Sequence, residues 1–422
     1  MRTPDTWTDL LRVEPDFLEL EKRVAGGLTD YRLIHPAIFS RHGWDLLPEE
    51  RLFRMILPFL RLQVSRAKTA MPELYASRLA EIEAEEIRSA AHWRQIPPFV
   101  KDDDLERGLP GFRTLAAQNP GLLRPRDLAE PTAVFGSGGS LGKATPTFVT
   151  LRDREREIQA WRRGHDYHGL TPGDTVLYTY NPSHKGGQWM QESLWAHGVN
   201  VLPRRPDEGP ERVLENIRDY GVNALFTVQQ PAEGAGRQAK AAGINLYSLV
   251  QASLEYPEFE GLLVPDEHGK KQVEFIFLGG FEIVPLALEL AEQYLDCTPI
   301  ATLLGSSEAI PQACSTHPGL TPGGICHYNH LHLLQGPHYV ELVKPSEKGW
   351  VPVTKGETGL LVYTSWARDG TLWIRYAPGD IAVCLLDEGE CPCGLYPPVI
   401  AGVRRANVQE SEALLLTGCA AG

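Results

Sequence analysis

The sequence has no run of about 18 apolar residues, and it therefore predicts no transmembrane helix. The first residues, Met1-Arg2-Thr3-Pro4-Asp5, contain no apolar core of the kind that a secretory signal needs. No block of basic side chains is present either, because 41 Lys and Arg are interspersed with 54 Asp and Glu for a net charge of −13. We therefore expect a cytoplasmic protein whose partners include neither a membrane nor a nucleic acid.

Cysteine is missing from the first two-thirds of the chain. The seven cysteines lie between Cys297 and Cys419, and their number is odd. This distribution favours a local metal site over a network of disulfides. The chain has no internal repeat and no low-complexity segment. Its 422 residues are 42% hydrophobic, which is enough for a large core divided into two or three domains.

Helical patterns dominate residues 1–120. Apolar residues recur at helical spacing over 49–65, where Pro58 predicts a kink or a break. A second helix is expected over 72–90, and residues 96–102 are expected to form an extended connector. We interpret this region as scaffold and cover for a cleft formed later in the chain.

Strand and helix patterns alternate from residue 132 to residue 304. The predicted strands are 132–135, 145–149, 174–180, 200–203, 224–228, 273–278 and 300–304. The predicted helices are 150–165, which begins with a capping box at Thr150 and Asp153, and 190–197, 211–220 and 286–294. This alternation predicts a parallel sheet with helices on its faces. After residue 311 the pattern changes to short strands, at 339–343, 359–364 and 381–385.

These patterns predict an α/β protein with four regions. They are a helical N-terminal region at 1–120, an α/β core at 121–310, a β-rich subdomain at 311–403 and a short tail at 404–422. Ligands of such sheets bind beyond the carboxyl ends of the strands. Two loops are predicted there, Gly279-Gly280-Phe281-Glu282 and Gly305-Ser306-Ser307-Glu308.

A Gly-rich loop with one lysine follows the strand at 132–135 and runs from Gly136 to Thr145. Glycine backbone can approach phosphate oxygens closely, so the loop is either a phosphate cradle or a flexible surface loop. It is not a P-loop, because five residues instead of four separate Gly136 from Gly142, Ala144 follows Lys143, and a strand follows the loop. A dinucleotide-binding fingerprint is also missing, because no G-x-G-x-x-G opens a helix here.

The loop Ser137-Gly138-Gly139-Ser140-Leu141-Gly142-Lys143-Ala144-Thr145 resembles the S-[SG]-G-[ST]-T-G-x-P-[ST] signature of adenylate-forming enzymes. From about Leu60 to Asn407, the chain resembles phenylacetate–CoA ligases and the acyl-protein synthetases of bacterial luciferase operons. Four further loops and a connector match motifs of that group in the same order; they are 96–102, Gly280-Phe281-Glu282, Gly305-Ser306-Ser307-Glu308, the I-R-Y-x-x-G-D motif at 374–380, and Cys391-Pro392-Cys393-Gly394.

The resemblance implies a fold and a reaction. The fold would be a large adenylating domain of stacked αβ sheets plus a β-rich subdomain. The reaction would use ATP and Mg²⁺ to convert a small-molecule carboxylic acid into an acyl-adenylate, and then transfer the acyl group to a thiol of CoA, a carrier protein or Cys419. Two alternatives remain, an amide-forming or nucleotidylating ligase with an amine acceptor and a non-catalytic nucleotide-binding subunit. The acid and the acceptor are open, as is a homodimer.

Site residues follow from the same resemblance, position by position. The β- and γ-phosphates would be held by Ser137, Gly138, Gly139, Ser140, Gly142 and Lys143, and the adenine would be flanked by Gly279, Gly280 and Glu282. Ser307 would donate to the α-phosphate, and Glu308 would bind Mg²⁺, unless it is an ordinary carboxylate at a helix start. Asp380 would accept hydrogen bonds from both ribose hydroxyls, unless it is a turn residue after Gly379. A late arginine, Arg405 or its neighbour Arg404, would touch ribose or phosphate.

The acyl pocket is predicted at residues 178–189, which follow a strand, contain aromatic side chains and end in Gly186-Gly187 before a helix. The candidate residues are Tyr180, His184 and Gly187, with His184 or Lys185 meeting the substrate carboxylate. The alternative is an exposed loop with an incidental histidine.

A second constellation combines C-x-x-H with C-x-C, at Cys314, His317, Cys391 and Cys393. Four such ligands would form a closed tetrahedral zinc site, which is structural because a catalytic zinc keeps one open position. Zinc-bearing members of the resembled group use similar elements. Other nearby residues could replace one ligand, namely Cys326, His327, His330 and His332. The alternative is a set of free thiols in a core.

The sequence departs from the resembled group at three points. Leu304 stands where the group has an adenine-stacking tyrosine, and Ala144 replaces a proline. The group's mobile C-terminal lid domain is expected to be absent. The acyl-protein synthetases also lack it, and in them a C-terminal cysteine carries the acyl group. Cys419, preceded by Gly418, is similar to that cysteine, unless it is an inert terminal thiol.

Overall fold

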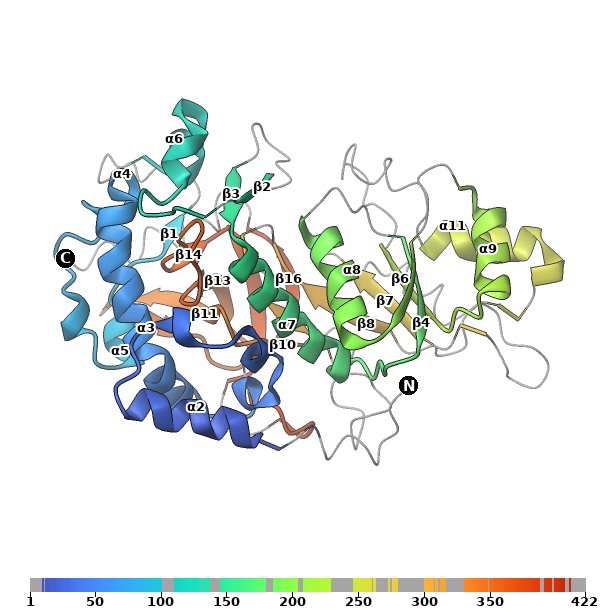
Figure 1. Cartoon of the computed structure of the whole chain (residues 1–422), viewed down its shortest axis with the longest axis horizontal. Coiled ribbons are helices and arrows are strands. Elements are labelled where there is room, and N and C mark those ends of the chain that lie inside the picture. The colour runs from blue at the N-terminus through green and yellow to red at the C-terminus, as the bar shows by residue number, and fades with distance from the viewer. Residues whose placement is uncertain are drawn as a thin grey trace. The chain divides into compact units, whose positions relative to one another are not determined.

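The computed structural model describes residues 10, 12–100, 110–130, 132–136, 145–179, 185–203, 208–228, 246–259, 261–262, 272–273, 275–279, 300–306, 308–309, 312–315, 330–347, 349–387, 391–396, 398–406 and 410. The chain divides into two compact units (Figure 1). The parallel-sheet unit comprises Met1–Leu10, Trp161–Gly305 and Ala313–Leu331, and the mixed unit comprises Leu11–Ala160, Ser306–Gln312 and His332–Gly422. The division falls within helix α7 (Leu151–Tyr167).

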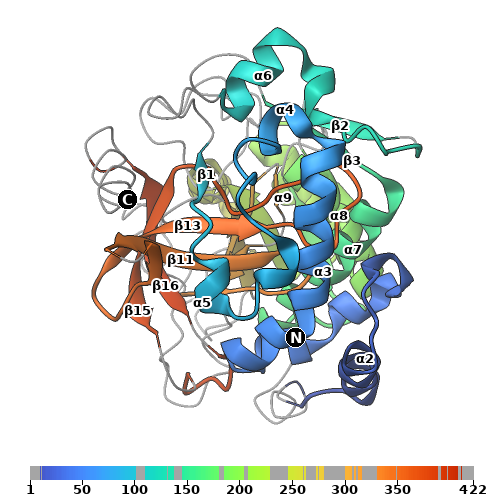
Figure 2. The ribbon, with the colours of Figure 1, turned by 90° about the vertical axis from the view of Figure 1, so that its left-hand side faces the viewer.

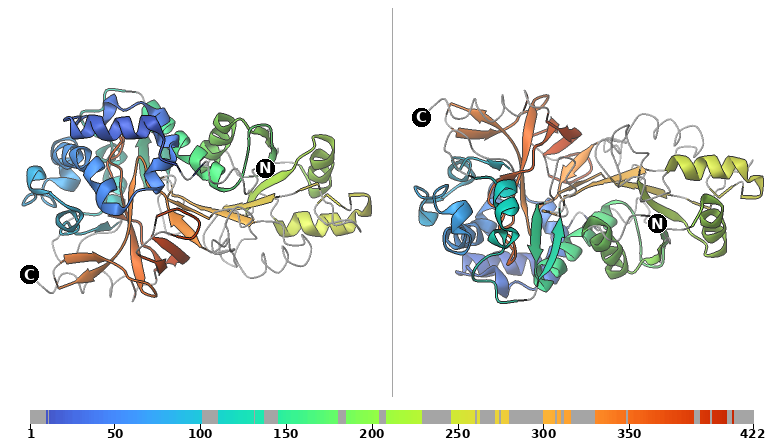
Figure 3. Two further views of the ribbon diagram at one scale, coloured as in Figure 1. Left: turned by 90° about the horizontal axis from the view of Figure 1, so that it is seen from below. Right: turned by 90° about the horizontal axis from the view of Figure 1, so that it is seen from above.

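The parallel-sheet unit is built on strands in the order β5-β4-β6-β7-β8-β9. Their bounds are Asn200–Pro203 for β5, Thr175–Tyr178 for β4, Ala224–Val228 for β6, Phe275–Gly279 for β7, Ile300–Leu304 for β8 and Ala313–Cys314 for β9. The pairs from β5 to β8 are parallel, and β9 is antiparallel to β8. The predicted strands and their parallel pairing are therefore confirmed. Figure 3 shows the ribbon from two further sides.

Helices α8 (Lys185–His197), α9 (Pro210–Asp219) and α11 (Leu246–Glu255) accompany these strands. Val213, Leu214 and Ile217 share one face of α9 and are fully buried. They form one core cluster with α11 and with β4, β6 and β7. This is the covering of a parallel sheet that the alternation of patterns predicted. The predicted helix at 286–294 lies outside the described residues.

The mixed unit contains strands in the order β1-β14-β13-β15-β16, and β11 pairs with both β12 and β13. Their bounds are Phe99–Val100 for β1, Tyr376–Ala377 for β14, Thr358–Thr364 for β13, Asp380–Leu386 for β15, Val399–Arg405 for β16, Tyr339–Ser346 for β11 and Gly349–Pro352 for β12. β1 and β14 are parallel, and the other pairs are antiparallel. β2 (Ala133–Gly136) and β3 (Pro146–Val149) form a separate antiparallel pair, and β10 covers Leu331–Leu333.

The N-terminal helices differ from two expectations. α3 (Glu49–Ala70) continues through Pro58, so the predicted break there is wrong. In Figure 2, α3 crosses in front of β11 and β13. Phe53 on its apolar face meets Tyr339 at the start of β11, with ring centroids 5.7 Å apart. That buried face holds the helix together although the proline lacks one backbone donor.

The helix predicted over 72–90 is also wrong. Only α4 (Pro72–Tyr75), a short 3₁₀ turn at Ala84–Glu86 and the first residue of α5 (Ala90–Trp93) are helical there. Side chains of α3 satisfy the backbone instead, because Arg61 donates two hydrogen bonds of 3.0 and 2.7 Å to the carbonyl of Ile87. Tertiary hydrogen bonds thus outweigh the local preference for a helix.

The remaining described helices of this unit are α2 (Pro15–Ala25), α6 (Phe112–Gln118) and 3₁₀ turns at Tyr31–Leu33, Pro36–Ser40, His42–Asp45 and Pro120–Leu123. Its core is aromatic: the Trp366 ring lies 5.2 Å from the Phe59 ring and 5.6 Å from the Trp44 ring. Trp366 belongs to the loop between β13 and β14, so this loop is anchored in the core. No helix among the described residues has the length and apolar character needed to cross a bilayer.

Candidate functional site

Two buried tyrosines bring the predicted site elements of the mixed unit together. Tyr363 of β13 lies opposite Tyr376 of β14, and their rings meet edge to face with centroids 5.4 Å apart. The Tyr363 hydroxyl lies 3.3 Å from Ser306 Oγ, and the Tyr376 hydroxyl lies 3.5 Å from Glu308 Oε1. Both halves of the Ser306-to-Glu308 loop therefore rest on this tyrosine pair.

The electrostatics of the pair connect the loop to the motif that ends at Asp380. Burial raises the pKa of Tyr363 well above its ordinary value, and the negative charges of Glu308 and, to a smaller extent, Asp380 raise this pKa further. Tyr363 is therefore a neutral hydroxyl that senses both carboxylates. Two carboxylates predicted to contact the same nucleotide thus act on one side chain.

Glu308 is a buried carboxylate, with 3% of the residue exposed. Among the described residues, no Lys or Arg side chain forms an ion pair with it, and Arg368 donates instead to its backbone carbonyl. An unpaired buried carboxylate is unfavourable, and a hard divalent cation is the kind of partner that offsets it. The residue therefore fits the predicted Mg²⁺ ligand. Glu308 and Ala309 lie in a bend, not at a helix start.

The loop that presents Glu308 is closed by its own hydrogen bonds. Ser306 Oγ accepts from the Ala309 N–H at 3.2 Å and from Gln312 Nε2 at 2.9 Å, and the Ser306 N–H donates to the Ala309 carbonyl at 3.0 Å. These bonds close the loop into a compact turn. Ser307, the predicted donor to the α-phosphate, lies outside the described residues.

Asp380 begins β15 and is 3% exposed, so it is a buried strand residue and not part of the turn. It lies opposite Arg405 of β16, whose Nη1 is 3.1 Å from Asp380 Oδ1. Gly379 has a φ of +96°, a left-handed conformation that places Asp380 directly after the turn. The ion pair orients the carboxylate that is predicted to bind ribose.

The structure separates the two late arginines. Arg405 donates to the Pro378 carbonyl as well as pairing with Asp380. Arg404 instead donates to Glu410 Oε2 at 2.7 Å on an exposed surface. Of the two arginines, Arg405 is therefore the one that reaches the predicted ribose site, although its contact with a nucleotide stays a prediction.

A cluster of three candidate metal ligands lies elsewhere in the mixed unit. His332, Cys391 and Cys393 are buried, and their ligand atoms all lie within 4.8 Å of one another. Cys393 Sγ is 3.4 Å from His332 Nε2. The Gly394 N–H donates to the Cys391 carbonyl at 2.7 Å, which folds the C-x-C segment into a turn. This donor set of two thiols and one imidazole fits zinc.

The other half of the predicted zinc site is not tested. Cys314 ends β9 in the parallel-sheet unit, and His317 lies outside the described residues. His332, one of the alternative ligands at the sequence level, instead lies beside the cysteine pair. The sequence could not select it, because histidines are frequent over 317–338 and only the fold brings one of them to Cys393.

The predicted acyl pocket is described only in part. Tyr180 and His184 lie outside the described residues. Gly187 is buried in the first turn of α8, and its carbonyl accepts a hydrogen bond of 2.6 Å from the Tyr178 hydroxyl. The ammonium of the buried Lys185 lies 5.5 Å from the centre of the Trp189 ring. The role of this segment stays a prediction.

Several predicted residues lie outside the described part of the chain. They are Ser137, Gly138, Gly139, Ser140, Gly142, Lys143, Gly280, Glu282 and Cys419. The flanks of the Gly-rich loop are described, and β3 follows it as the predicted return strand, paired to β2. Gly279 ends β7, at the carboxyl end of a parallel strand as expected.

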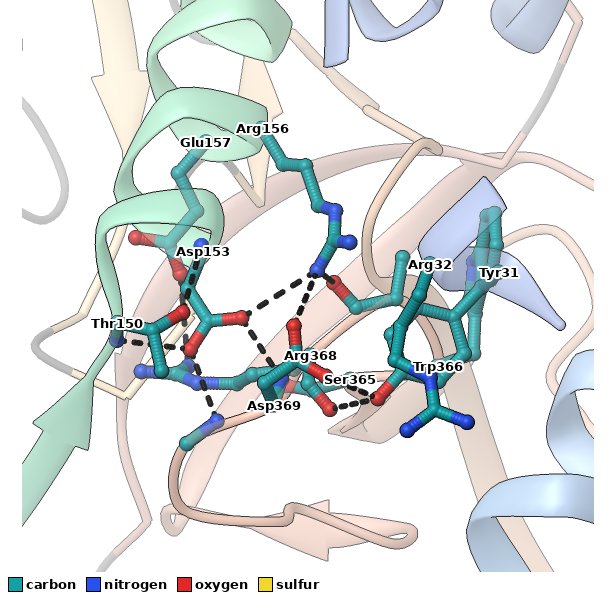
Figure 4. A network of polar contacts seen from close by, with 12 residues as sticks. Tyr31, Arg32, Thr150, Asp153, Arg156, Glu157, Ser365, Trp366, Arg368 and Asp369 are labelled. Carbon is teal, nitrogen blue, oxygen red and sulfur yellow. Dashed lines mark hydrogen bonds and ion pairs between the residues drawn. The ribbon is translucent and has the colours of Figure 1, made fainter. Parts of the chain in front are cut away.

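The sequence missed a buried polar network at the loop between β13 and β14 (Figure 4). The capping box predicted at the start of α7 is present, because Thr150 and Asp153 exchange hydrogen bonds of 3.0 and 3.1 Å. Asp153 also accepts from the backbone N–H groups of Asp369 and Gly370, at 2.7 and 2.8 Å. One carboxylate therefore serves both as a helix cap and as the anchor of a distant loop. Only its first role has a sequence signal.

No protein-family model and no curated protein matches this chain. Solved structures do match. A 2-hydroxyisobutyryl-CoA ligase, in an open conformation with 2-HIB-AMP and CoA, is 17% identical with a TM-score of 0.64, covering 85% of this chain and 75% of that one. The same ligase in its thioesterification state gives 17% identity and a TM-score of 0.66, covering 86% and 69%. The chain therefore shares the fold of that ligase, and the predicted α/β adenylating fold is confirmed.

Proposed function

We propose that this protein activates a carboxylic acid with ATP as an acyl-adenylate and then transfers the acyl group to a thiol. The observation that carries the proposal is the contact of Glu308 with Tyr376, which belongs to the I-R-Y-x-x-G-D motif that ends at the buried Asp380, because the fold thereby brings together two distant motifs assigned to one nucleotide. The shared fold with a ligase whose structures contain 2-HIB-AMP and CoA supports it.

Each described site residue has a separate role in nucleotide binding. Asp380 accepts hydrogen bonds from the ribose hydroxyls, and Arg405 holds that carboxylate in position. Glu308 would hold Mg²⁺, which would supply neutralisation of the phosphate charge. Tyr376 stays within 3.5 Å of Glu308, and the neutral Tyr363 fixes the Ser306 end of the loop. The Gly-rich loop at 136–145 grips the departing pyrophosphate, and Ser307 donates to the α-phosphate.

The chemistry has two displacement steps. In the first, an oxygen of the substrate carboxylate attacks the α-phosphorus, and the bond from that phosphorus to the oxygen between the α- and β-phosphates breaks, so that pyrophosphate leaves with that oxygen. In the second, a thiolate attacks the acyl carbon and AMP leaves. Both steps depend on positioning and charge neutralisation more than on covalent chemistry by side chains. The thiol belongs to CoA, a carrier protein or Cys419.

A zinc ion bound by His332, Cys391 and Cys393 completes the proposal for the mixed unit. A fourth ligand would close the site and make it structural. The burial of all three described ligands supports a structural role, because a catalytic zinc needs access for substrate.

Acid-dependent exchange of labelled pyrophosphate into ATP tests the activity. The purified protein is assayed with a panel of aromatic, fatty and amino-acid-like acids, followed by product analysis with thiol and amine acceptors side by side. Exchange with at least one acid and a thioester product are expected. An amide product would instead identify the amine-dependent ligase.

A non-catalytic nucleotide-binding subunit is the second candidate. It is favoured by Leu304, a buried aliphatic residue at the end of β8 where the resembled group has a stacking tyrosine. Loss of aromatic stacking weakens adenine binding by about 0.5–1.5 kcal/mol. Nucleotide binding without exchange for any acid would support this candidate.

A further inference from the structure

Arg368 lies in the loop between β13 and β14, where 1% of the residue is exposed. Its Nη1 donates to the backbone carbonyl of Glu308 and lies 3.4 Å from Glu157 Oε1. One guanidinium thus links the predicted Mg²⁺ ligand to helix α7. A planar guanidinium can hold two acceptors in a fixed geometry, which a lysine ammonium does not.

Glu157 is itself fixed from a second side. Its side chain is 2% exposed, and Oε1 lies 3.2 Å from Nε2 of His338. The other ring nitrogen of His338 lies 2.9 Å from Ser365 Oγ, in the same loop as Arg368. These contacts form a ring, because they start at Ser365 and return through His338 and Glu157 to Arg368 in the same loop. The carboxylate of Glu157, which is the counter-charge of the guanidinium, is therefore held in place.

The backbone of the loop between β13 and β14 is held in place, as the Arg368 side chain is. Asp153 accepts from two of its N–H groups, and Arg156 Nη1 lies 3.0 Å from Asp369 Oδ2. The Tyr31 hydroxyl donates to Asp369 Oδ1 at 2.8 Å (Figure 4). Gln63 donates to the Arg368 carbonyl at 2.7 Å. The loop carries Arg368 on a rigid support formed by three helical elements.

The backbone and the carboxylate of Glu308 differ in how they are held. Glu308 has a firm backbone contact with Arg368, whereas its carboxylate has only the 3.5 Å contact with Tyr376 among the described residues. The Arg368 contact is therefore one restraint on how the Glu308 peptide is turned, in addition to the hydrogen bonds that close the loop. The Nε and Nη2 atoms of Arg368 have no hydrogen-bond partner among the described residues.

We propose that Arg368 is a positioning residue that sets the Glu308 carboxylate for the divalent cation, with Glu157 holding the guanidinium. This inference rests on the proposed function, because it takes Glu308 as the cation ligand. Partners that orient a metal ligand commonly affect metal affinity about 10-fold or more. Arg368 does not itself touch the cation or the nucleotide in this arrangement.

The test measures Mn²⁺ binding in the presence of α,β-methylene-ATP, for the wild type and the variants Arg368→Met, Arg368→Lys and Glu308→Gln. Arg368→Lys keeps a charge beside Glu157 if the methionine variant does not fold. Arg61→Met is the matched control, because Arg61 also binds a backbone carbonyl in the mixed unit. We expect Mn²⁺ affinity about 10-fold weaker in both Arg368 variants, unchanged in Arg61→Met, and analogue affinity in EDTA unchanged in all.

The outcomes separate this inference from the activity. Wild-type Mn²⁺ affinity in folded Arg368→Met or Arg368→Lys would overturn the positioning role, and so would wild-type affinity in Glu308→Gln. Pyrophosphate exchange by the wild type is measured in parallel. Weakened Mn²⁺ binding in the Arg368 variants with no exchange for any acid would refute the activity and uphold the positioning role.

Discussion

Replacing Asp153 with alanine should release the start of α7 and the loop at 365–371 together. The buried carboxylate accepts three backbone hydrogen bonds, from Thr150, Asp369 and Gly370, at 2.7 to 3.0 Å. Hydrogen bonds to a charged acceptor contribute about 1.5 kcal/mol or more each, so the free energy of unfolding of this region should fall by about 4 kcal/mol. The loop also requires a glycine at position 370, because a side chain on Gly370 would collide with the backbone of Phe148.

Hydrogen exchange measured by mass spectrometry on peptides covering residues 365–371 gives the local effect. The Asp369 and Gly370 amides should exchange faster by the factor that about 4 kcal/mol implies, close to a thousandfold. Asp30→Ala is the control, because Asp30 caps a short 3₁₀ turn from the surface and should cost about 1 kcal/mol. A loss under about 1 kcal/mol in Asp153→Ala, with unchanged exchange of these amides, would refute the shared-anchor account.

The ion pair of Arg405, the cluster of metal ligands and the buried His165 each lead to an expectation. Arg405→Met should weaken ATP binding severalfold, whereas the neighbouring Arg404→Met should not; equal effects would contradict the assigned ion pair with Asp380. Elemental analysis should find about one zinc per chain in the wild type and much less in Cys393→Ser. Wild-type protein that contains no metal would contradict the proposed zinc site. Burial, then the neighbouring histidines, lower the pKa of His165 well below its ordinary 6.5, so its stabilising effect is present above pH 6.5 and is lost as pH falls through the lowered pKa. Acid unfolding should therefore be less steep in His165→Gln, and identical pH profiles would contradict this.

The sequence predicted the parallel sheet well because its strands are short apolar runs between helices, and burial on both faces leaves that pattern unambiguous. It predicted the start of α7 because a capping box is local. It failed over 72–90, where Arg61 takes the Ile87 carbonyl from outside the segment. No local pattern contains that information.

The site divides in the same way. Glu308 and Asp380 stand in recognisable motifs, so the sequence identified them. Tyr363 and Arg368 have no such signal, because their importance arises from a strand pairing and from a contact across 60 residues. The zinc cluster is intermediate, since the C-x-C pair is readable and the choice of His332 depends on the fold.

The most direct measurement is acid-dependent pyrophosphate exchange in Glu308→Gln and Asp380→Asn, beside the wild type and Arg61→Met. The account predicts exchange in the wild type and Arg61→Met, with a loss of about 100-fold or more in both carboxylate variants, because each removes charged contacts to the nucleotide or its cation. Near wild-type exchange in either folded carboxylate variant would contradict the claim that the two residues serve one nucleotide.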